Sequence, residues 1–302
     1  MWFKNLTIFR LTEAFTLTPG ELEQKLQTLQ FRSCGPHEEF SFGWTQPIGK
    51  SADQRVHAAN GFMMLCGKKE EKVLPTAVVN EMLQEKIGEI EDREARKLSK
   101  KERTTLKDEL IFELLPKAFR FSRKTYAYID PKGGWLLIDS ASAKSAEDLL
   151  SNLRKCLGSL PAIPLNTIDK PSVNMTQWLL TQETPEDLTI EDECELRALQ
   201  EEGGIIRCKK HDLSVPEIKN HLDTGKQVIK LAVNWAGRIA FVLDEHLALK
   251  RLRFLDMVQE QAADIDTGSA AERFDADFTI MTGELAELLP RLTAWFGGEN
   301  RT

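Results

Sequence analysis

REARKLSKKERTTLKDELIFELLPKAFRFSRK, residues 93–124, is the stretch from which both an architectural element and a class of partner can be predicted. It holds eleven Lys and Arg residues against five Asp and Glu residues, a net charge of +6. The whole chain carries −7, so the remaining residues sum to −13. A positive field concentrated on an acidic protein indicates a polyanionic partner. The alternative is a solvated helical face on which Glu and Lys alternate.

The same stretch lies in a long helical segment that begins at Pro75. The sequence from Ser99 to Glu102 forms a capping box, so a second helix is expected to start there and to end at Pro116. Residues 75–116 are therefore predicted to form an arm of two helices. The arm carries a narrow apolar seam that needs support from a partner or from the main body: Val79, Leu83, Ile87, Ile90 and Leu98.

Outside the arm, alternating apolar residues predict strands, and capping residues predict helices that begin at Thr18 and Ser145. Gly158 is expected to end the second of these helices, and the proline-rich residues 158–172 are the best candidate for a domain boundary. Ser214 and Thr282 are predicted to cap two further helices. The predicted strands cover residues 2–11, 61–67, 124–130, 134–139, 204–209, 226–233, 238–243, 249–254 and 275–281. Pro131, Lys132 and Gly133 are predicted to form a turn between the third and fourth of these strands. Because the elements show no regular βαβ alternation, the predicted class is α+β.

Charge is segregated in the second half of the chain as well. Residues 183–202 carry about −8, residues 207–253 about +5, and residues 256–302 about −7. Two basic segments separated by acidic ones favour a polyanion-binding surface over a surface of evenly mixed charge.

Basic side chains in these segments are the predicted phosphate contacts, because Lys and Arg release counterions when they meet a nucleic acid backbone. Lys226 and Lys230 are expected on one face of a strand, since they are four residues apart, although a solvated sheet face explains them equally well. Phe119 could stack on bases or fill a partner's pocket, but core packing is the expectation from its sequence context alone. The candidate DNA-binding residues are Arg93, Arg96, Lys97, Lys100, Lys101, Lys117, Arg120, Arg123, Arg207, Lys209, Lys210, His211, Lys226 and Lys230.

Signals for catalysis, cofactors and metals are weak. The five cysteines are far apart, no histidine lies in an HExxH or HxH frame, and no Walker A sequence is present. Asp264, Asp266, Asp275 and Asp277 are better explained as solvated carboxylates than as a metal site. We therefore expect no catalytic residue, no metal and no cofactor. The chain also lacks a signal peptide and a membrane-spanning run, so a cytoplasmic protein with reduced thiols and no membrane partner is expected.

Several segments carry a family likeness that extends over essentially the whole chain. The sequences ANGFMMLCGKKEEKVLP (59–75), EARKLSKKE (94–102), LLPKAF (114–119), ASAKSAEDLLSNLRKCLGSLP (141–161), GGIIRCKKHDL (203–213), LKRLRF (249–254) and RFDADFTIMTGEL (273–285) resemble the bacterial RdgC family of recombination-associated proteins.

This resemblance implies a homodimer closed into a ring around double-stranded DNA, bound without marked sequence preference. It further implies nucleoid association and restraint of RecA-promoted recombination. The implied protomer has a central domain (1–74 and 117–171), a helical tip arm (75–116) and a base domain (172–302). Phe119 would act at a dimer gate, and Lys209 and Lys210 would contact DNA. His211 stands where the family is expected to have Gln, which leaves a specific polar contact there in doubt.

The ring would place basic segments around its hole and acidic segments on its outside. Two other functions remain open from the sequence. One is a protein-interaction scaffold that acts on recombination or replication proteins without contacting DNA. The other is a DNA-processing enzyme, for which metal-dependent cleavage or ATP turnover would be the evidence.

Overall fold

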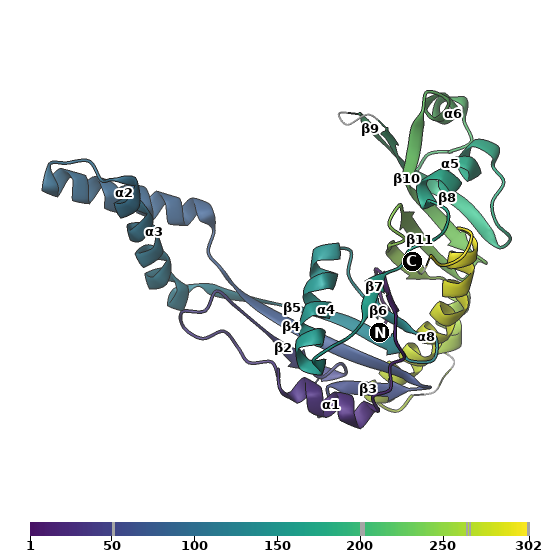
Figure 1. The fold of residues 1–302 in the computed structure, drawn as a ribbon, viewed down its shortest axis with the longest axis horizontal. Coiled ribbons are helices and arrows are strands. Elements are labelled where there is room, and N and C mark those ends of the chain that lie inside the picture. The colour runs from purple at the N-terminus through teal and green to yellow at the C-terminus, as the bar shows by residue number, and fades with distance from the viewer. Residues whose placement is uncertain (50–51, 200–202, 264, 266, 301–302) are drawn as a thin grey trace. The chain divides into compact units, whose positions relative to one another are not determined.

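A computed structural model describes residues 1–49, 52–199, 203–263, 265 and 267–300 (Figure 1). The predicted α+β class is confirmed, because helices and two antiparallel sheets alternate irregularly along the chain. The chain divides into two compact units. Unit 1 comprises residues 1–26, 46–66 and 125–302, and unit 2 comprises residues 27–45 and 67–124. In the described part of the chain, no helix is long and apolar enough to cross a bilayer.

The first sheet has the strand order β2-β4-β5-β6-β1-β7, with β3 paired to β4. Two of its strands, β4 and β5, are twelve residues long and contribute to both units. The predicted turn between β5 and β6 is confirmed, since the Gly134 amide donates to the Asp130 carbonyl at 2.8 Å. The strands are β1 (Thr7–Leu11), β2 (Phe40–Thr45), β3 (Val56–Ala59), β4 (Phe62–Val73), β5 (Phe119–Asp130), β6 (Trp135–Ile138) and β7 (Ala162–Pro164).

Two helices of the first half begin with side-chain caps. At α1 (Pro19–Gln27), Thr18 and Glu21 form the predicted capping box. At α4 (Ala143–Leu157) the cap is Ser142, whose hydroxyl accepts from the Ser145 amide at 3.3 Å. The prediction that Ser145 caps this helix is thus wrong by three residues. Gly158 ends α4 with φ 82°, a conformation that glycine adopts without a steric penalty.

The second sheet lies entirely in unit 1 and has the order β12-β11-β10-β8-β9. Its strands are β8 (Leu188–Ala198), β9 (Ile205–Lys209), β10 (Lys226–Trp235), β11 (Ile239–Asp244) and β12 (Leu249–Phe254). The accompanying helices are α5 (Pro171–Thr181), α6 (Pro216–Asp223) and α7 (Asp256–Ala263). The cap of α6 is Val215, without a side-chain hydrogen bond, so the prediction of a Ser214 cap is wrong.

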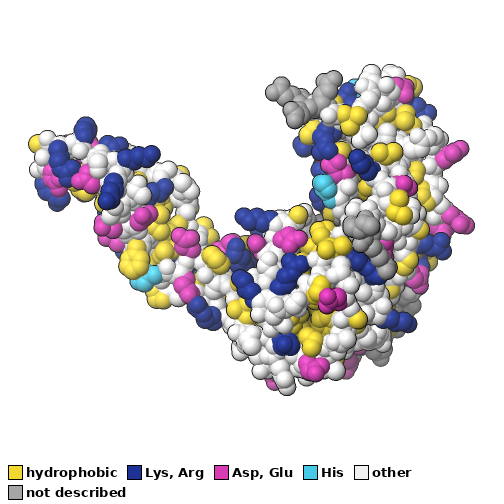
Figure 2. All heavy atoms as spheres, in the orientation of Figure 1, with side chains coloured by type: hydrophobic (Ala, Val, Ile, Leu, Met, Phe, Trp, Pro, Cys, Tyr) yellow, Lys and Arg dark blue, Asp and Glu magenta, His cyan; other side chains and the backbone are white. Residues whose placement is uncertain are grey.

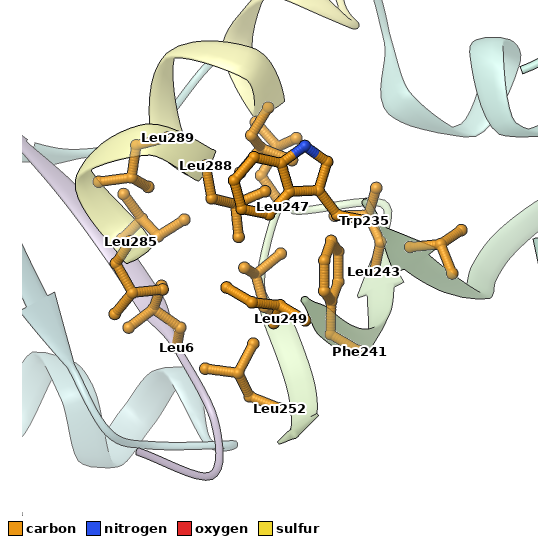
Figure 3. Packing of buried hydrophobic residues seen from close by; sticks show 14 of the residues in the cluster. Leu6, Trp235, Phe241, Leu243, Leu247, Leu249, Leu252, Leu285, Leu288 and Leu289 are labelled. Atoms are coloured by element: carbon orange, nitrogen blue, oxygen red, sulfur yellow. The ribbon is translucent and has the colours of Figure 1, made fainter. Parts of the chain in front are cut away.

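The last helix, α8 (Ala270–Ala294), overturns the predicted strand at 275–281 and the predicted cap at Thr282. Ser269 caps it by accepting from the Glu272 amide at 3.2 Å. Phe274, Phe278, Met281 and Leu285 are buried at three- and four-residue spacing, a helical stripe that the shorter window 275–281 does not reveal. Figure 3 shows Leu285, Leu288 and Leu289 of α8 packed against residues of the second sheet and against Leu6, which precedes β1. The labelled residues of the sheet and its connecting loop are Trp235, Phe241, Leu243, Leu247, Leu249 and Leu252.

Unit 2 contains the helical hairpin of α2 (Thr76–Glu94) and α3 (Lys100–Leu114), followed by a short 3-10 turn, η2 (Leu115–Lys117) (Figure 1). The two predicted helices are confirmed, as is the Ser99–Glu102 capping box. Ala95 ends α2 in the left-handed region, with φ 47°. The hairpin's buried residues form a small cluster of their own: Val79, Leu83, Ile87, Leu98 and Leu110.

Candidate nucleic-acid interface

The basic cluster of the hairpin lies around the turn between α2 and α3, and acidic residues share it. Figure 2 shows Lys and Arg side chains interspersed with Asp and Glu on these helices. Arg96 lies 2.8 Å from a Glu94 oxygen and 2.7 Å from a Glu102 oxygen, and Lys97 lies 2.6 Å from Glu91. Arg93 makes a long contact of 3.8 Å with Glu94, and its side chain is 74% exposed.

Two carboxylates of this turn, Glu91 and Glu102, are held in their ionised form. Hydrogen bonds from Lys97 and from the Leu98 amide lower the pKa of Glu91 to about 2. Hydrogen bonds from Arg96 and from Ser99 lower the pKa of Glu102 to about 2 as well. The two remaining candidates at this turn, Lys100 and Lys101, are exposed and form no ion pair within the described residues.

The candidates that follow the hairpin surround an exposed aromatic side chain. Phe119 is 86% exposed at the start of β5, so the expectation of core packing is wrong for this residue. Lys117 is exposed in η2, and Arg120 lies 3.9 Å from the buried carboxylate of Glu70. Arg123 lies over the Phe121 ring at 5.9 Å, an arrangement that favours a cation–π contact.

Four candidates of the second half lie on the edge strand β9 and in the residues just after it. Arg207 donates to Glu195 at 2.8 Å, whereas Lys209 and Lys210 are exposed and have no ion pair within the described residues. Lys210 has φ 52°, which ends the strand. The His211 amide donates to the Asp192 carbonyl at 3.1 Å, and its exposed ring approaches the Asp212 carbonyl at 2.8 Å.

The prediction that Lys226 and Lys230 share a face is wrong. Lys226 pairs with Ala198 and Lys230 pairs with Glu195, with a register shift between Val228 and Lys230 on β10. The two partners are three residues apart on β8, so they lie on opposite faces of the sheet. The extra residue of the bulge thus reverses the alternation on which the prediction depended.

The sequence interpretation missed the acidic residues that contact these cations. Glu195 accepts from Arg207 and also from Lys230, the latter at 3.1 Å. Burial alone would raise the pKa of Glu195, but hydrogen bonds from the two cations bring it below its ordinary value. Part of acidic segment 183–202 therefore lies beside basic residues at β8. The alternate spacing of Glu191, Glu193 and Glu195 was a signal of a charged strand face.

Two hollows border β8. One, of about 410 Å³, has Ala232 and Val242 in its lining together with Glu193, Arg251 and Arg253. The other, of about 600 Å³, is lined by residues of β8 and of the segment after β9, including Asp192, Lys210, His211 and Arg253. Both hollows present acidic and basic groups together.

Comparison with known proteins decides the family. A family model described as "Putative exonuclease, RdgC" matches residues 1–299. The chain belongs to the RdgC family. A recombination-associated protein RdgC from Tolumonas auensis is 49% identical over 299 residues, which cover 99% of each chain. The corresponding protein from Aeromonas hydrophila is 46% identical over 302 residues and the full length of both. The RdgC protein of Proteus mirabilis is 44% identical over 299 residues, again 99% of each chain.

The description of the RdgC family model raises the question of nuclease chemistry, which corresponds to the DNA-processing enzyme left open by the sequence. Within the described residues of this RdgC-family chain, no group of three or more His, Cys, Asp or Glu side chains is arranged to hold a metal ion. The curated relatives are named for recombination. The absence of catalytic activity stays a prediction, and the assays below test it.

Proposed function

We propose that this RdgC-family chain binds double-stranded DNA without sequence preference, encircles it as a homodimeric ring, and restrains RecA-promoted recombination at the nucleoid. The observation that carries the DNA-binding part is the pair Lys209 and Lys210 at the end of β9. Both are exposed and form no ion pair within the described residues, so their charge is available to phosphates. Relatives of nearly equal length are named as recombination-associated proteins, which supports the cellular context.

Lysine suits contact with DNA of any sequence. Its ammonium group is a point charge that meets phosphate oxygens without reading base edges. Each phosphate that is neutralised releases counterions, so affinity should fall with salt with a slope of about −0.9 per phosphate. The exposed cations of the hairpin, Lys100 and Lys101, would add contacts of the same kind.

Exposed Phe119 supports the homodimeric part of the proposal. A phenylalanine that is 86% exposed leaves a large apolar area in water, and covering it with a second copy would recover that free energy. Under this proposal Phe119 acts at a dimer gate.

The first experiment measures the affinity of the purified protein for two unrelated DNA duplexes over a range of salt concentrations. Replacing Lys209 and Lys210 together by Ala should weaken binding equally on both duplexes and reduce the salt slope by about one per lysine. The matched control is Lys144→Ala with Lys155→Ala, which removes the same charge from exposed positions on α4. Binding that does not change with salt, or equal loss in the control, would rule out the proposed contact.

A second experiment tests the assembly. Solution mass should show a dimer, and Phe119→Ser should shift the protein toward monomer and shorten its retention on closed circular DNA. A dimer that withstands this change and keeps the same retention on DNA would contradict the proposed role of Phe119 at a dimer gate.

Strand-exchange assays with RecA test whether the protein restrains RecA-promoted recombination. Binding to RecA without DNA would favour the scaffold, and metal-dependent cleavage by the pure protein would favour a nuclease.

A further inference from the structure

The three glutamates at alternate positions of β8 form ion pairs with cations from three other strands of the second sheet. We call Glu191, Glu193 and Glu195 the β8 carboxylate row. Glu195 contacts Arg207 from β9 at 2.8 Å and Lys230 from β10 at 3.1 Å. The other two carboxylates contact β12, with Arg251 at 2.6 Å from Glu193 and Arg253 at 3.5 Å from Glu191.

These pairs neutralise most of the charge that this face would offer to a polyanion. Four cations and three carboxylates leave a net charge of +1 for the group. The cations remain accessible nonetheless: the side chains of Arg207, Arg251 and Arg253 are 64%, 55% and 66% exposed. The carboxylates are more deeply set, with Glu193 at 21% and Glu195 at 12% exposure. A phosphate approaching from solvent would therefore reach the guanidinium groups before the carboxylates.

The hollow beside the row shows where a released guanidinium could move. Its lining includes Glu193, Arg251 and Arg253, together with the side chains of Ala232 and Val242. Its volume of about 410 Å³ is space next to the Arg251 side chain. Without the carboxylate that now holds it, Arg251 is not confined to one direction.

We infer that the β8 carboxylate row is a built-in counter-charge that limits how many phosphates this face engages, and so sets the strength and the salt dependence of DNA binding. The inference rests on the proposed DNA binding. Carboxylates near the path of a polyanion repel it, and each also competes with phosphate for an arginine. A face weakened in this way releases DNA more readily, which lets a protein that binds any sequence move along the duplex.

Glu193→Gln is the sharpest test, because Glu193 is less buried than Glu195 and holds a single cation. The change removes the charge and keeps the shape of the side chain. We expect duplex affinity near 0.1 M salt to rise roughly fivefold, and the salt slope to steepen by about 0.9 for each phosphate that Arg251 newly contacts. The opposite hypothesis, that the row holds the arginines in position for DNA, predicts weaker binding.

Two further variants separate the possible causes. Glu147→Gln on α4 changes net charge equally, from an exposed position without an ion pair within the described residues, and should leave affinity within twofold of wild type. In a protein that already carries Arg251→Ala, adding Glu193→Gln should raise duplex affinity much less than it does in the wild-type protein, because the released guanidinium is absent. Thermal unfolding of each variant confirms that the protein remains folded.

The outcomes distinguish the inference from the function on which it rests. Wild-type protein that fails to bind duplex DNA overturns the proposed function. Wild-type protein that binds, together with a Glu193→Gln variant of equal or lower affinity and unchanged slope, overturns the inference alone. A gain as large in Glu147→Gln, or a full gain without Arg251, also overturns it.

Discussion

The helical hairpin of α2 and α3 and the second sheet both carry basic residues, but they hold their charges differently. In the hairpin, the cations pair with carboxylates around an exposed turn, above a core of five buried side chains. In the second sheet, the side chains of Glu195 and Asp244 are 12% and 7% exposed, and the opposite face of the sheet adjoins a large hydrophobic cluster.

This difference concerns the support beneath the charges. The ion pairs themselves are alike, since the side chain of Glu91 in the hairpin is 10% exposed and that of Glu195 in the sheet is 12% exposed. Cations on the surface of both regions are screened by water and salt, so their pairs contribute little free energy. The sheet therefore presents its cations on a large packed core, whereas the hairpin presents them on an element with only a small core of its own. The following changes test this comparison.

The largest effect is expected in the main core. Leu285 on α8 is fully buried among the residues that join α8 to the second sheet. Leu285→Ala should lower the free energy of unfolding by about 2–5 kcal/mol, through lost burial and a residual cavity. Denaturant titration of the full chain, followed by tryptophan fluorescence, measures this loss of stability. A loss below 1 kcal/mol would contradict the tight packing described for this cluster.

The chemically identical change in the hairpin should have a smaller and more local effect. Leu110 on α3 is 1% exposed but packs in the small hairpin cluster. Leu110→Ala should cost no more than the hairpin's own stability, on the order of 2–3 kcal/mol, because a weakly supported element opens before the rest. Hydrogen exchange should accelerate in α2 and α3 only. Equal acceleration in β10 and β11 would show that the two regions unfold as one.

A smaller effect is expected at the start of α3. Ser99→Ala removes the hydroxyl that accepts from the Glu102 amide and donates to the Glu102 carboxylate. The expected loss is about 1 kcal/mol, confined to the hairpin. Ser99→Asp is the control, since aspartate also caps helices and should restore exchange protection of the first turn of α3.

The smallest effect is the response of the hairpin to acid. The pKa values of Glu91 and Glu102 are about 2 in the folded protein, below their ordinary value of 4.5. A lowered folded pKa means that these groups stabilise the hairpin above about pH 4.5, and that this contribution is lost as pH falls toward 2. Hydrogen exchange corrected for intrinsic rates should show the loss in α2 and α3. The loss should be smaller in a Glu91→Gln variant, and an equal loss would exclude Glu91 as its source.

The elements that sequence patterns predicted well are those that local chemistry specifies. The capping boxes at Thr18 and Ser99 and the turn after Asp130 depend on residues a few positions apart. The predicted strand at 249–254 coincides with β12, although Arg251, with φ 51°, interrupts the alternation of buried and exposed residues. Short-range signals of this kind need no knowledge of the fold.

The failures occurred where distant residues decide the outcome. The window 275–281 contains residues that favour strands, but α8 gains its stability from burial along its full length. The bulge in β10 reverses the faces of Lys226 and Lys230, and it depends on pairing with β8. Glu195 contacts Arg207 and Lys230, which come from two different strands. Counting charges along the sequence could not predict that these three residues lie in contact.

The contact between the beginning of the chain and β12 constrains how the protein folds as it is synthesised. The Leu6 amide donates to the Leu249 carbonyl at 2.7 Å, and the Arg251 amide donates to the Asn5 side chain, 246 positions away. A ribosome must therefore complete more than four-fifths of the 302 residues before this pairing can form. Until then Leu6, which is fully buried in the finished protein, lacks the β12 part of its surroundings. Contacts of such long range slow folding, so newly made chains would depend on protection from aggregation at this stage.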